Sequence, residues 1–174
     1  MNDTWQIQFS GDLDTTIEAD IYVVDGFEIT PEEIESLHQY GRKVICYLNA
    51  GAWEDWRPDA PDYPTKVLGE AMEGWPGERW LDIRQLNLLM PLIETRMDIC
   101  QSKGCDGIDP DNIHGYTQFT GFELSYNDQI RFNQFLADAA HQRGMSIGLK
   151  NDLEQIDDLV EDFDWALNEQ CFEY

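Results

Sequence analysis

The sequence predicts an α/β fold of the (β/α)8 TIM-barrel type, and three observations indicate it. Short, continuous apolar runs alternate with helical stretches along all 174 residues, and such runs are typical of parallel strands buried on both faces. Three helical stretches are each followed by a glycine and then a strand, as in the αβ turn of a repeating unit. Polar residues follow nearly every strand, as in barrel enzymes whose active sites lie at the carboxyl ends of the strands.

Seven segments are predicted to be strands. They cover residues 5–9, 21–24, 43–48, 80–83, 106–109, 146–149 and 164–167. A closed barrel has eight strands and usually about 250 residues. We therefore expect one domain, residues 1–174, that is truncated after its seventh strand and incomplete at the C-terminus. No G-x-G-x-x-G motif follows the first strand, which disfavours the dinucleotide-binding alternative.

Four segments are predicted to be helices, and their ends carry clear signals. They cover residues 31–41, 86–104, 125–144 and 153–160. Thr30 and Glu33 form a capping box before the first helix, and Gly41 ends it. Ser125, with Asp128 three residues later, is the expected cap of the third helix. Because the helices separate the strands, a parallel sheet is expected.

The composition is strongly acidic. There are 35 Asp and Glu against 11 Lys and Arg, which gives a formal net charge of -24. Nucleic acids and anionic membranes bind basic patches, so the composition argues strongly against both as partners. No apolar run is long enough to span a membrane. The charge is either a general surface property or attracts a cationic substrate into an acidic cleft.

The four cysteines match no zinc pattern and form no CxxC motif. Cys46 lies in an apolar run and is expected to be a buried thiol. Cys100 and Cys105 flank a helix end, where a bridge between them is possible. The residues leave the redox compartment open, and they predict no cofactor.

Two strand-end segments carry residues suited to acid–base chemistry. The run GIDPDN places Asp109, Asp111 and Asn112 after one strand, and DWALNEQC places Asn168 and Glu169 after another. Two carboxylates across a pocket are what glycosidic bond cleavage requires. The alternative for GIDPDN is a polar turn that caps the next segment. The spacing does not by itself select Asp111 over Asp109.

A third strand end carries Lys150, Asn151 and Asp152. Lys150 is expected either to pair with a site carboxylate and hold it ionised or to form a structural salt bridge. A Mg²⁺ site built from nearby carboxylates is a chemical alternative. Aromatic residues at strand ends and in the long loop 51–79 are expected to stack on sugar rings or to pack the interior. They are Trp5, Tyr47, Trp53, Trp56, Trp75, Trp80 and Tyr116.

Several motifs extend over almost the whole chain. They are WQIQFSGDLD, GRKVICYLNAG, WRPD, GWPGERWLDIR, GCDGIDPDN, GLKND and NEQCFEY. Together they resemble glycoside hydrolase family 114, the endo-α-1,4-polygalactosaminidases. The resemblance implies a barrel that cuts α-1,4-linked galactosamine polymers internally, with Asp111 and Glu169 as catalytic residues. Asn49 stands in a region where related sequences often carry a serine, so fine specificity is expected to differ.

The resemblance also implies a cationic amino-sugar polymer as partner, attracted by carboxylates at the rim. The expected substrate-binding residues are Asp25, Tyr47, Asp109, Asn112, Lys150, Asn151, Asp152 and Asn168. It implies an extracellular or cell-surface location, although the chain begins MNDTWQIQF without a visible signal peptide. By analogy with α-retaining barrels, Asp111 is the expected nucleophile and Glu169 the acid/base. The rivals are a non-catalytic carbohydrate-binding relative and a metal-dependent barrel enzyme.

Overall fold

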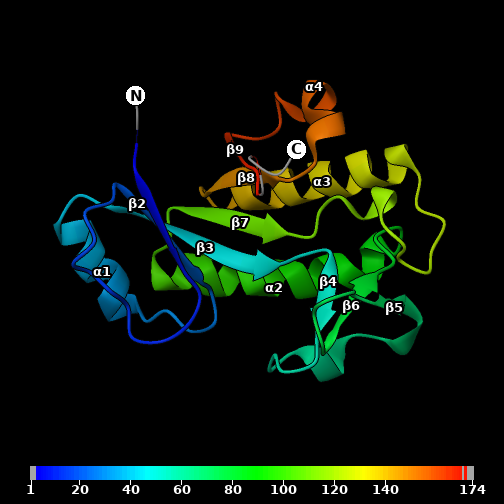
Figure 1. Ribbon diagram of the computed structural model, residues 1–174, viewed down its shortest axis with the longest axis horizontal. Helices are drawn as coiled ribbons and strands as arrows, with labels where there is room; N and C mark the ends of the chain where they lie inside the picture. The colour runs from blue at the N-terminus through cyan, green and yellow to red at the C-terminus, as the bar shows by residue number, and fades with distance from the viewer. Residues whose placement is uncertain (1–2, 170, 172–174) are drawn as a thin grey trace.

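A computed structural model describes residues 3–169 and 171. Six parallel strands form the main sheet, in the order β1-β2-β3-β7-β8-β9. Their bounds are β1 Trp5–Gln8, β2 Ile21–Asp25, β3 Lys43–Asn49, β7 Gly107–Asp111, β8 Ser146–Lys150 and β9 Trp165–Leu167. The sheet twists from β1 to β9 as part of a barrel (Figure 1), with a helix between successive strands from β2 onward. The predicted barrel-type α/β fold is therefore confirmed.

The helices also follow the prediction closely. They are α1 Pro31–Gln39, α2 Leu86–Lys103, α3 Tyr126–Gln142 and α4 Ile156–Leu159. The expected capping box from Thr30 to Glu33 is present, and the expected cap Ser125 also forms a capping box with Asp128. Gly104 ends α2 with a φ of 100°, a conformation that glycine adopts without steric cost. Short 3₁₀ turns lie at Ala60–Asp62, Thr65–Val67, Gly115–Thr117 and Leu153–Gln155.

One predicted strand lies in a different sheet. The apolar run 80–83 was expected to belong to the parallel sheet, but β6 Glu78–Leu81 pairs antiparallel with β4 Ala52–Glu54 and β5 Leu68–Ala71. Trp80 and Leu81 are buried there, and an apolar run gives no information about the direction of its neighbours. The parallel sheet therefore has six described strands, where seven were predicted.

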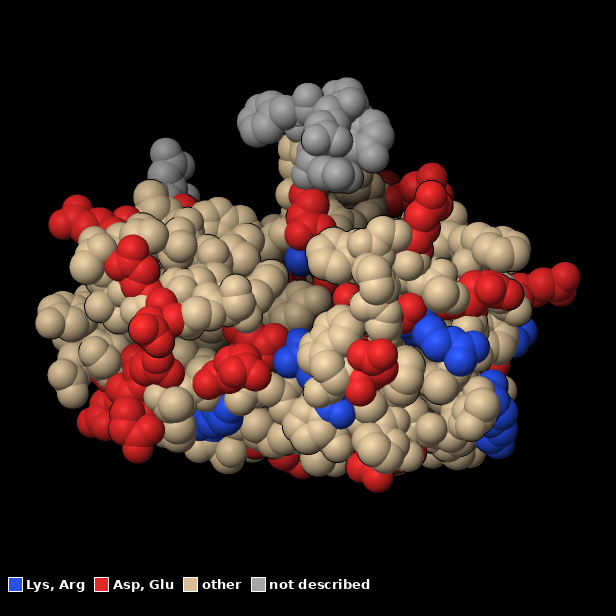
Figure 2. Space-filling view, turned by 60° about the horizontal axis from the view of Figure 1, so that its bottom comes forward, with Lys and Arg blue, Asp and Glu red and all other residues tan. Residues whose placement is uncertain are grey.

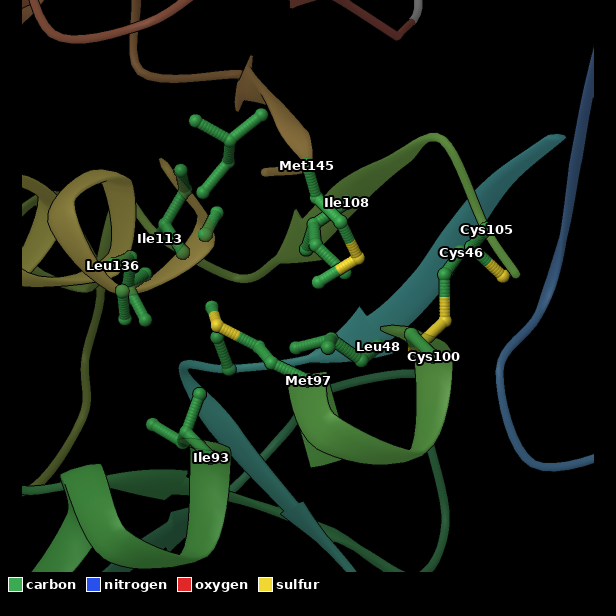
Figure 3. Close-up of a cluster of buried hydrophobic side chains, with 14 of the residues drawn as sticks. Cys46, Leu48, Ile93, Met97, Cys100, Cys105, Ile108, Ile113, Leu136 and Met145 are labelled. Carbon is green, nitrogen blue, oxygen red and sulfur yellow. A yellow bond between two sulfur atoms is a disulfide. The ribbon is translucent and has the colours of Figure 1, made fainter. Parts of the chain in front are cut away.

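The core lies between the sheet and the helices that cover it. In Figure 3, Ile93 and Met97 of α2 face Leu48 of β3 and Ile108 of β7, and all four are fully buried. Leu136 brings α3 into the same cluster. This packing fixes the direction of the strands and therefore the positions of the residues that follow them.

The cysteine pairing differs from both sequence-based expectations. Cys46 and Cys100 form a disulfide, with their Cα atoms 6.0 Å apart, and Cys105 is a buried free thiol. Cys46 was expected to be free, and a bridge between Cys100 and Cys105 was considered. The bonded residues are 54 positions apart, and only the packing of α2 against β3 brings them together.

The surface is acidic, as its composition requires. Figure 2 shows acidic side chains spread over much of one face, whereas basic side chains gather in a few places. Within residues 3–169 and 171, no helix is both long and apolar enough to cross a bilayer.

Candidate active site

A pocket of about 690 Å³ opens where β3, β7 and β8 end. Parallel strands commonly place functional side chains at this edge of a barrel. Six of the predicted site residues line the pocket: Tyr47, Asp111, Asn112, Lys150, Asn151 and Glu169. The antiparallel sheet contributes the facing wall through Glu78 and Trp80.

Lys150 lies among three carboxylates. Its Nζ is 3.4 Å from Asp109 Oδ2, 3.5 Å from Glu169 Oε1 and 3.9 Å from Asp111 Oδ1. Lys150 therefore pairs with the three carboxylates predicted at the strand ends, which agrees with either of its two expected roles. Burial acts to lower the pKa of Lys150, but attraction by Asp111, Asp109 and Glu169 outweighs it and raises the pKa above its usual value. The ammonium occupies the position that a Mg²⁺ ion bound by these carboxylates would need.

Asp111 is held by donors on both oxygens. The Tyr47 hydroxyl donates to Oδ2 at 2.8 Å, and the Asn112 backbone N–H donates to Oδ1 at 2.9 Å. Burial and the nearby charge of Asp111 raise the pKa of Tyr47 far above its usual value, so the phenol remains a donor. With Lys150 beside Oδ1, these contacts stabilise a negative charge on Asp111. This arrangement suits a nucleophile.

Glu169 is oriented by one neighbouring amide. Asn151 Nδ2 donates to Glu169 Oε2 at 2.9 Å, and the Glu169 backbone N–H donates to Asn151 Oδ1 at 2.8 Å. The Glu169 side chain is 55% exposed, against 21% for Asp111. Asn151 has a φ of 56°, a left-handed conformation that asparagine tolerates better than most residues. Glu169 is therefore the more solvent-accessible of the two carboxylates.

Asp109 lies beneath the pocket and does not line it. Burial raises the pKa of Asp109 to about 6, and the charges of Asp111 and Glu169 add to this against the attraction of Lys150. Its Oδ1 accepts no hydrogen bond from the described part of the chain. The geometry makes Asp109 the buried counter-ion of Lys150, where a contact with substrate had been expected.

Three other predicted binding residues do not line the pocket. Asp25 receives two hydrogen bonds from Arg57, at 2.9 and 2.7 Å. Asp152 is buried and accepts a hydrogen bond from Asn133 Nδ2 at 2.9 Å. These partners favour structural roles for both carboxylates in place of substrate binding. Asn168 is exposed near Glu169, and its binding role stays a prediction. Four residues of the NEQCFEY motif, 170 and 172–174, lie outside the described residues.

The pocket also contains residues that sequence reasoning missed. Phe9 packs on Tyr47 with ring centroids 4.3 Å apart, and its place at the end of the first predicted strand was a usable signal. His114 is half-buried beside Trp80. Burial lowers its pKa, which favours the neutral ring. Glu78 lies just before the run predicted as a strand, and nothing in its spacing marked it.

Asp152→Asn should stabilise the protein at pH 8 by on the order of 2 kcal/mol and have little effect at pH 4. Burial, reinforced by Glu154, raises the pKa of Asp152 from 3.8 to about 7. The folded state thus binds this proton more tightly than the unfolded chain, and that stabilisation is lost as the pH rises from about 4 through 7. Urea unfolding at both pH values measures the difference. Asp138→Asn, on the exposed face of α3, is the matched control, and an equal gain at both pH values would contradict the assignment.

Comparison with known proteins identifies similar glycoside hydrolases. The model of glycoside-hydrolase family GH114 matches residues 1–174. The crystal structure of Aspergillus fumigatus Ega3 in complex with galactosamine superposes with a TM-score of 0.96 and 43% identity, over 99% of this chain and 68% of that one. The glycoside hydrolase domain of PelA from Pseudomonas aeruginosa gives a TM-score of 0.80 at 15% identity, over 95% and 66%.

A more distant structure shares the fold alone. Amy13B of Eubacterium rectale has a TM-score of 0.63 at 10% identity, over 87% of this chain and 41% of its own. A search of curated proteins finds no match.

Proposed function

Because the chain belongs to glycoside-hydrolase family GH114, we propose that it cleaves α-1,4-linked galactosamine polymers, with Asp111 and Glu169 as its two catalytic carboxylates. The observation that carries this proposal is the convergence of both carboxylates on Lys150 in one pocket. The galactosamine bound to Ega3, a relative with 43% identity, supports the choice of sugar.

The contacts of the two carboxylates favour a retaining mechanism. Asp111, stabilised as an anion, attacks the anomeric carbon while Glu169 gives its proton to the leaving oxygen. Water then attacks the same carbon, Glu169 takes a proton from it, and the bond to Asp111 breaks. The charge on Asp111 disappears while it is bound to the sugar, so Lys150 then stabilises the Glu169 carboxylate as a base. One cation would thus serve both steps.

The charge of the protein supports an amine-bearing substrate. Four carboxylates besides Asp111 line the pocket: Glu70, Glu73, Glu78 and Glu169. A concentration of negative charge in a cleft attracts protonated amines over distances beyond direct contact. We infer that the acidic composition acts on the substrate chiefly at this pocket.

The Cys46–Cys100 disulfide supports an extracellular or cell-surface location. Structural disulfides form and persist in oxidising compartments and are rare in the reducing cytosol. An extracellular polysaccharide substrate fits the same location.

The direct test is hydrolysis of partly deacetylated α-1,4-galactosaminogalactan by the purified protein. New reducing ends together with a rapid fall in polymer length would support internal cleavage. Binding without new reducing ends would favour a non-catalytic carbohydrate-binding protein, and loss of activity with a chelator would favour a metal-dependent enzyme. NMR of the first products decides the stereochemistry, because retention requires the α-anomer to appear first.

Glu169→Gln should slow polymer cleavage by about 10²- to 10⁴-fold, because the variant cannot protonate the leaving oxygen. An activated aryl α-galactosaminide needs no such proton. The variant should therefore release one equivalent of phenol rapidly and then turn over slowly, because the second step lacks its base. Stopped-flow absorbance measures the burst, with Asp138→Asn as the control. An equal loss on both substrates would contradict the acid/base assignment.

A further inference from the structure

Glu78 is a buried carboxylate in the wall of the pocket. It is 8% exposed and lines the cavity opposite the strand ends. Asn49 Nδ2 donates a hydrogen bond to Glu78 Oε2 at 3.1 Å. The mechanism described above gives Glu78 no task, although the carboxylate lies in the same cavity as Asp111.

The pairing of β4 with β6 places Glu78 where its negative charge destabilises the folded state. Glu54 and Glu78 lie directly opposite each other in this antiparallel pair, where like charges are destabilising. Glu54 is compensated by Arg57 at 2.9 Å and Arg96 at 3.4 Å. Among the described residues, no cationic side chain lies within ion-pair distance of Glu78. A buried charge without a partner raises the free energy of the folded state.

The raised pKa of Glu78 also reflects the lack of a cationic partner. Burial raises the pKa of Glu78 to about 7, and the charges of Glu54 and Asp111 add to the effect. The hydrogen bond from Asn49 and the more distant Arg57 act in the opposite direction without cancelling it. A cation placed in the pocket would supply the missing counter-charge.

Two amides connect Glu78 to the catalytic strand end. Asn112 Nδ2 donates to Asn49 Oδ1 at 3.1 Å, and the Asn112 backbone N–H donates to Asp111. Asn49, 1% exposed, is held in place further by the Ala52 backbone N–H at 2.9 Å. Glu78 is therefore fixed in position relative to Asp111, as a residue that reads one substituent of the reacting sugar must be.

We propose that Glu78 determines selectivity for free amino sugars by pairing with the protonated amine of the sugar seated against Asp111. The inference rests on the proposed function and specifies its substrate. An acetamido or hydroxyl group in the same place carries no charge and leaves Glu78 unpaired. The site thus favours the amine and disfavours its neutral analogues.

Glu78→Gln removes the negative charge while keeping the packing of the side chain. The glutamine has nearly the same shape and retains an oxygen to accept the hydrogen bond from Asn49. For a deacetylated α-1,4-galactosamine oligomer, kcat/KM should fall by about 30-fold or more, mainly through a higher KM. For the N-acetylated oligomer it should change by less than about threefold. The selectivity ratio should therefore collapse in Glu78→Gln and stay unchanged in the control Asp138→Asn.

A binding measurement separates this inference from the proposed function. Calorimetric titration with galactosamine and with galactose should show that the wild type prefers the amine and that Glu78→Gln does not. If the wild type cleaves no polymer but shows this Glu78-dependent preference, the proposed function fails and the inference stands. If the wild type cleaves polymer and Glu78→Gln keeps its preference for amines, the inference is overturned.

Stability distinguishes selectivity from a structural role. Because the pKa of Glu78 is raised from 4.5 to about 7, the folded state loses stability as the pH rises from about 4.5 through 7. Glu78→Gln should therefore melt at a higher temperature than the wild type at pH 8 and at about the same temperature at pH 5. A lower melting temperature at both pH values, with selectivity intact, would show that Glu78 serves the fold.

Discussion

Asp111→Asn should reduce kcat/KM for the galactosamine polymer by on the order of 10⁴-fold or more while leaving the fold intact. The substitution keeps the shape of the side chain and one oxygen, which can accept from either the Tyr47 hydroxyl or the Asn112 backbone N–H. It removes the charge that is proposed to attack the anomeric carbon, and no other carboxylate in the pocket has the same set of donors. Reducing-end assays at high enzyme concentration measure the residual rate.

The matched control is Asp109→Asn on the same strand. Asp109 is buried beneath Lys150 and does not line the pocket, so its loss should lower the rate by less than about tenfold. Comparing these two variants decides whether Asp109 or Asp111 is the catalytic residue, which the spacing of the DPD run left open. Asp111→Gly with added azide extends the test, because azide can attack the anomeric carbon in place of the carboxylate and yield a glycosyl azide. A larger loss in Asp109→Asn than in Asp111→Asn would reverse the assignment.

Lys150→Met should lower the free energy of unfolding by about 3–5 kcal/mol, because it leaves the buried Asp109 carboxylate without its cation. Lys150 and Asp109 are 1% and 0% exposed, so solvent screens their interaction little. The loss should be larger at pH 8 than at pH 5, since the unpaired Asp109 takes up a proton as the pH falls. Chemical denaturation at the two pH values measures it, and catalysis should also fall.

The double variant Asp109→Asn/Lys150→Met tests the cause of that loss. Removing both buried charges should recover much of the stability lost in Lys150→Met, since no uncompensated carboxylate remains at position 109. Activity should not return with it, because Asp111 and Glu169 still lack their shared cation. If the double variant is no more stable than Lys150→Met, the loss comes from packing of the lysine side chain and not from charge.

Local patterns in the sequence were sufficient to predict most of the secondary structure. The caps at Thr30 and Ser125 depend on residues within one turn, and both are formed. The pairing of Lys150 with site carboxylates was also predictable, because parallel strands place their carboxyl ends at one edge. These features involve only local chemistry and a repeating topology.

Apart from Phe9, the features that sequence reasoning missed depend on distant parts of the chain. Nothing local distinguishes a strand of the barrel from β6, whose neighbours are antiparallel. Cys46 meets Cys100 only after α2 has packed on β3. Asp25 was predicted at the rim, but Arg57, which comes from the 51–79 loop, occupies its carboxylate. The unpaired charge of Glu78 could not be predicted, because it depends on Arg57 and Arg96 forming ion pairs with Glu54 and not with Glu78.

The small antiparallel sheet has a consequence for how such enzymes diversify. The two proposed catalytic carboxylates lie at the carboxyl ends of β7 and β9, whereas Glu78 lies on β6, between two strands of the parallel sheet in chain order. Under the two proposals, turnover and choice of sugar depend on separate stretches of the chain. Evolution can alter the stretch from β4 to β6 without disturbing the reacting groups. The same separation makes residues 52–81 a natural unit to exchange between relatives when a new specificity is engineered.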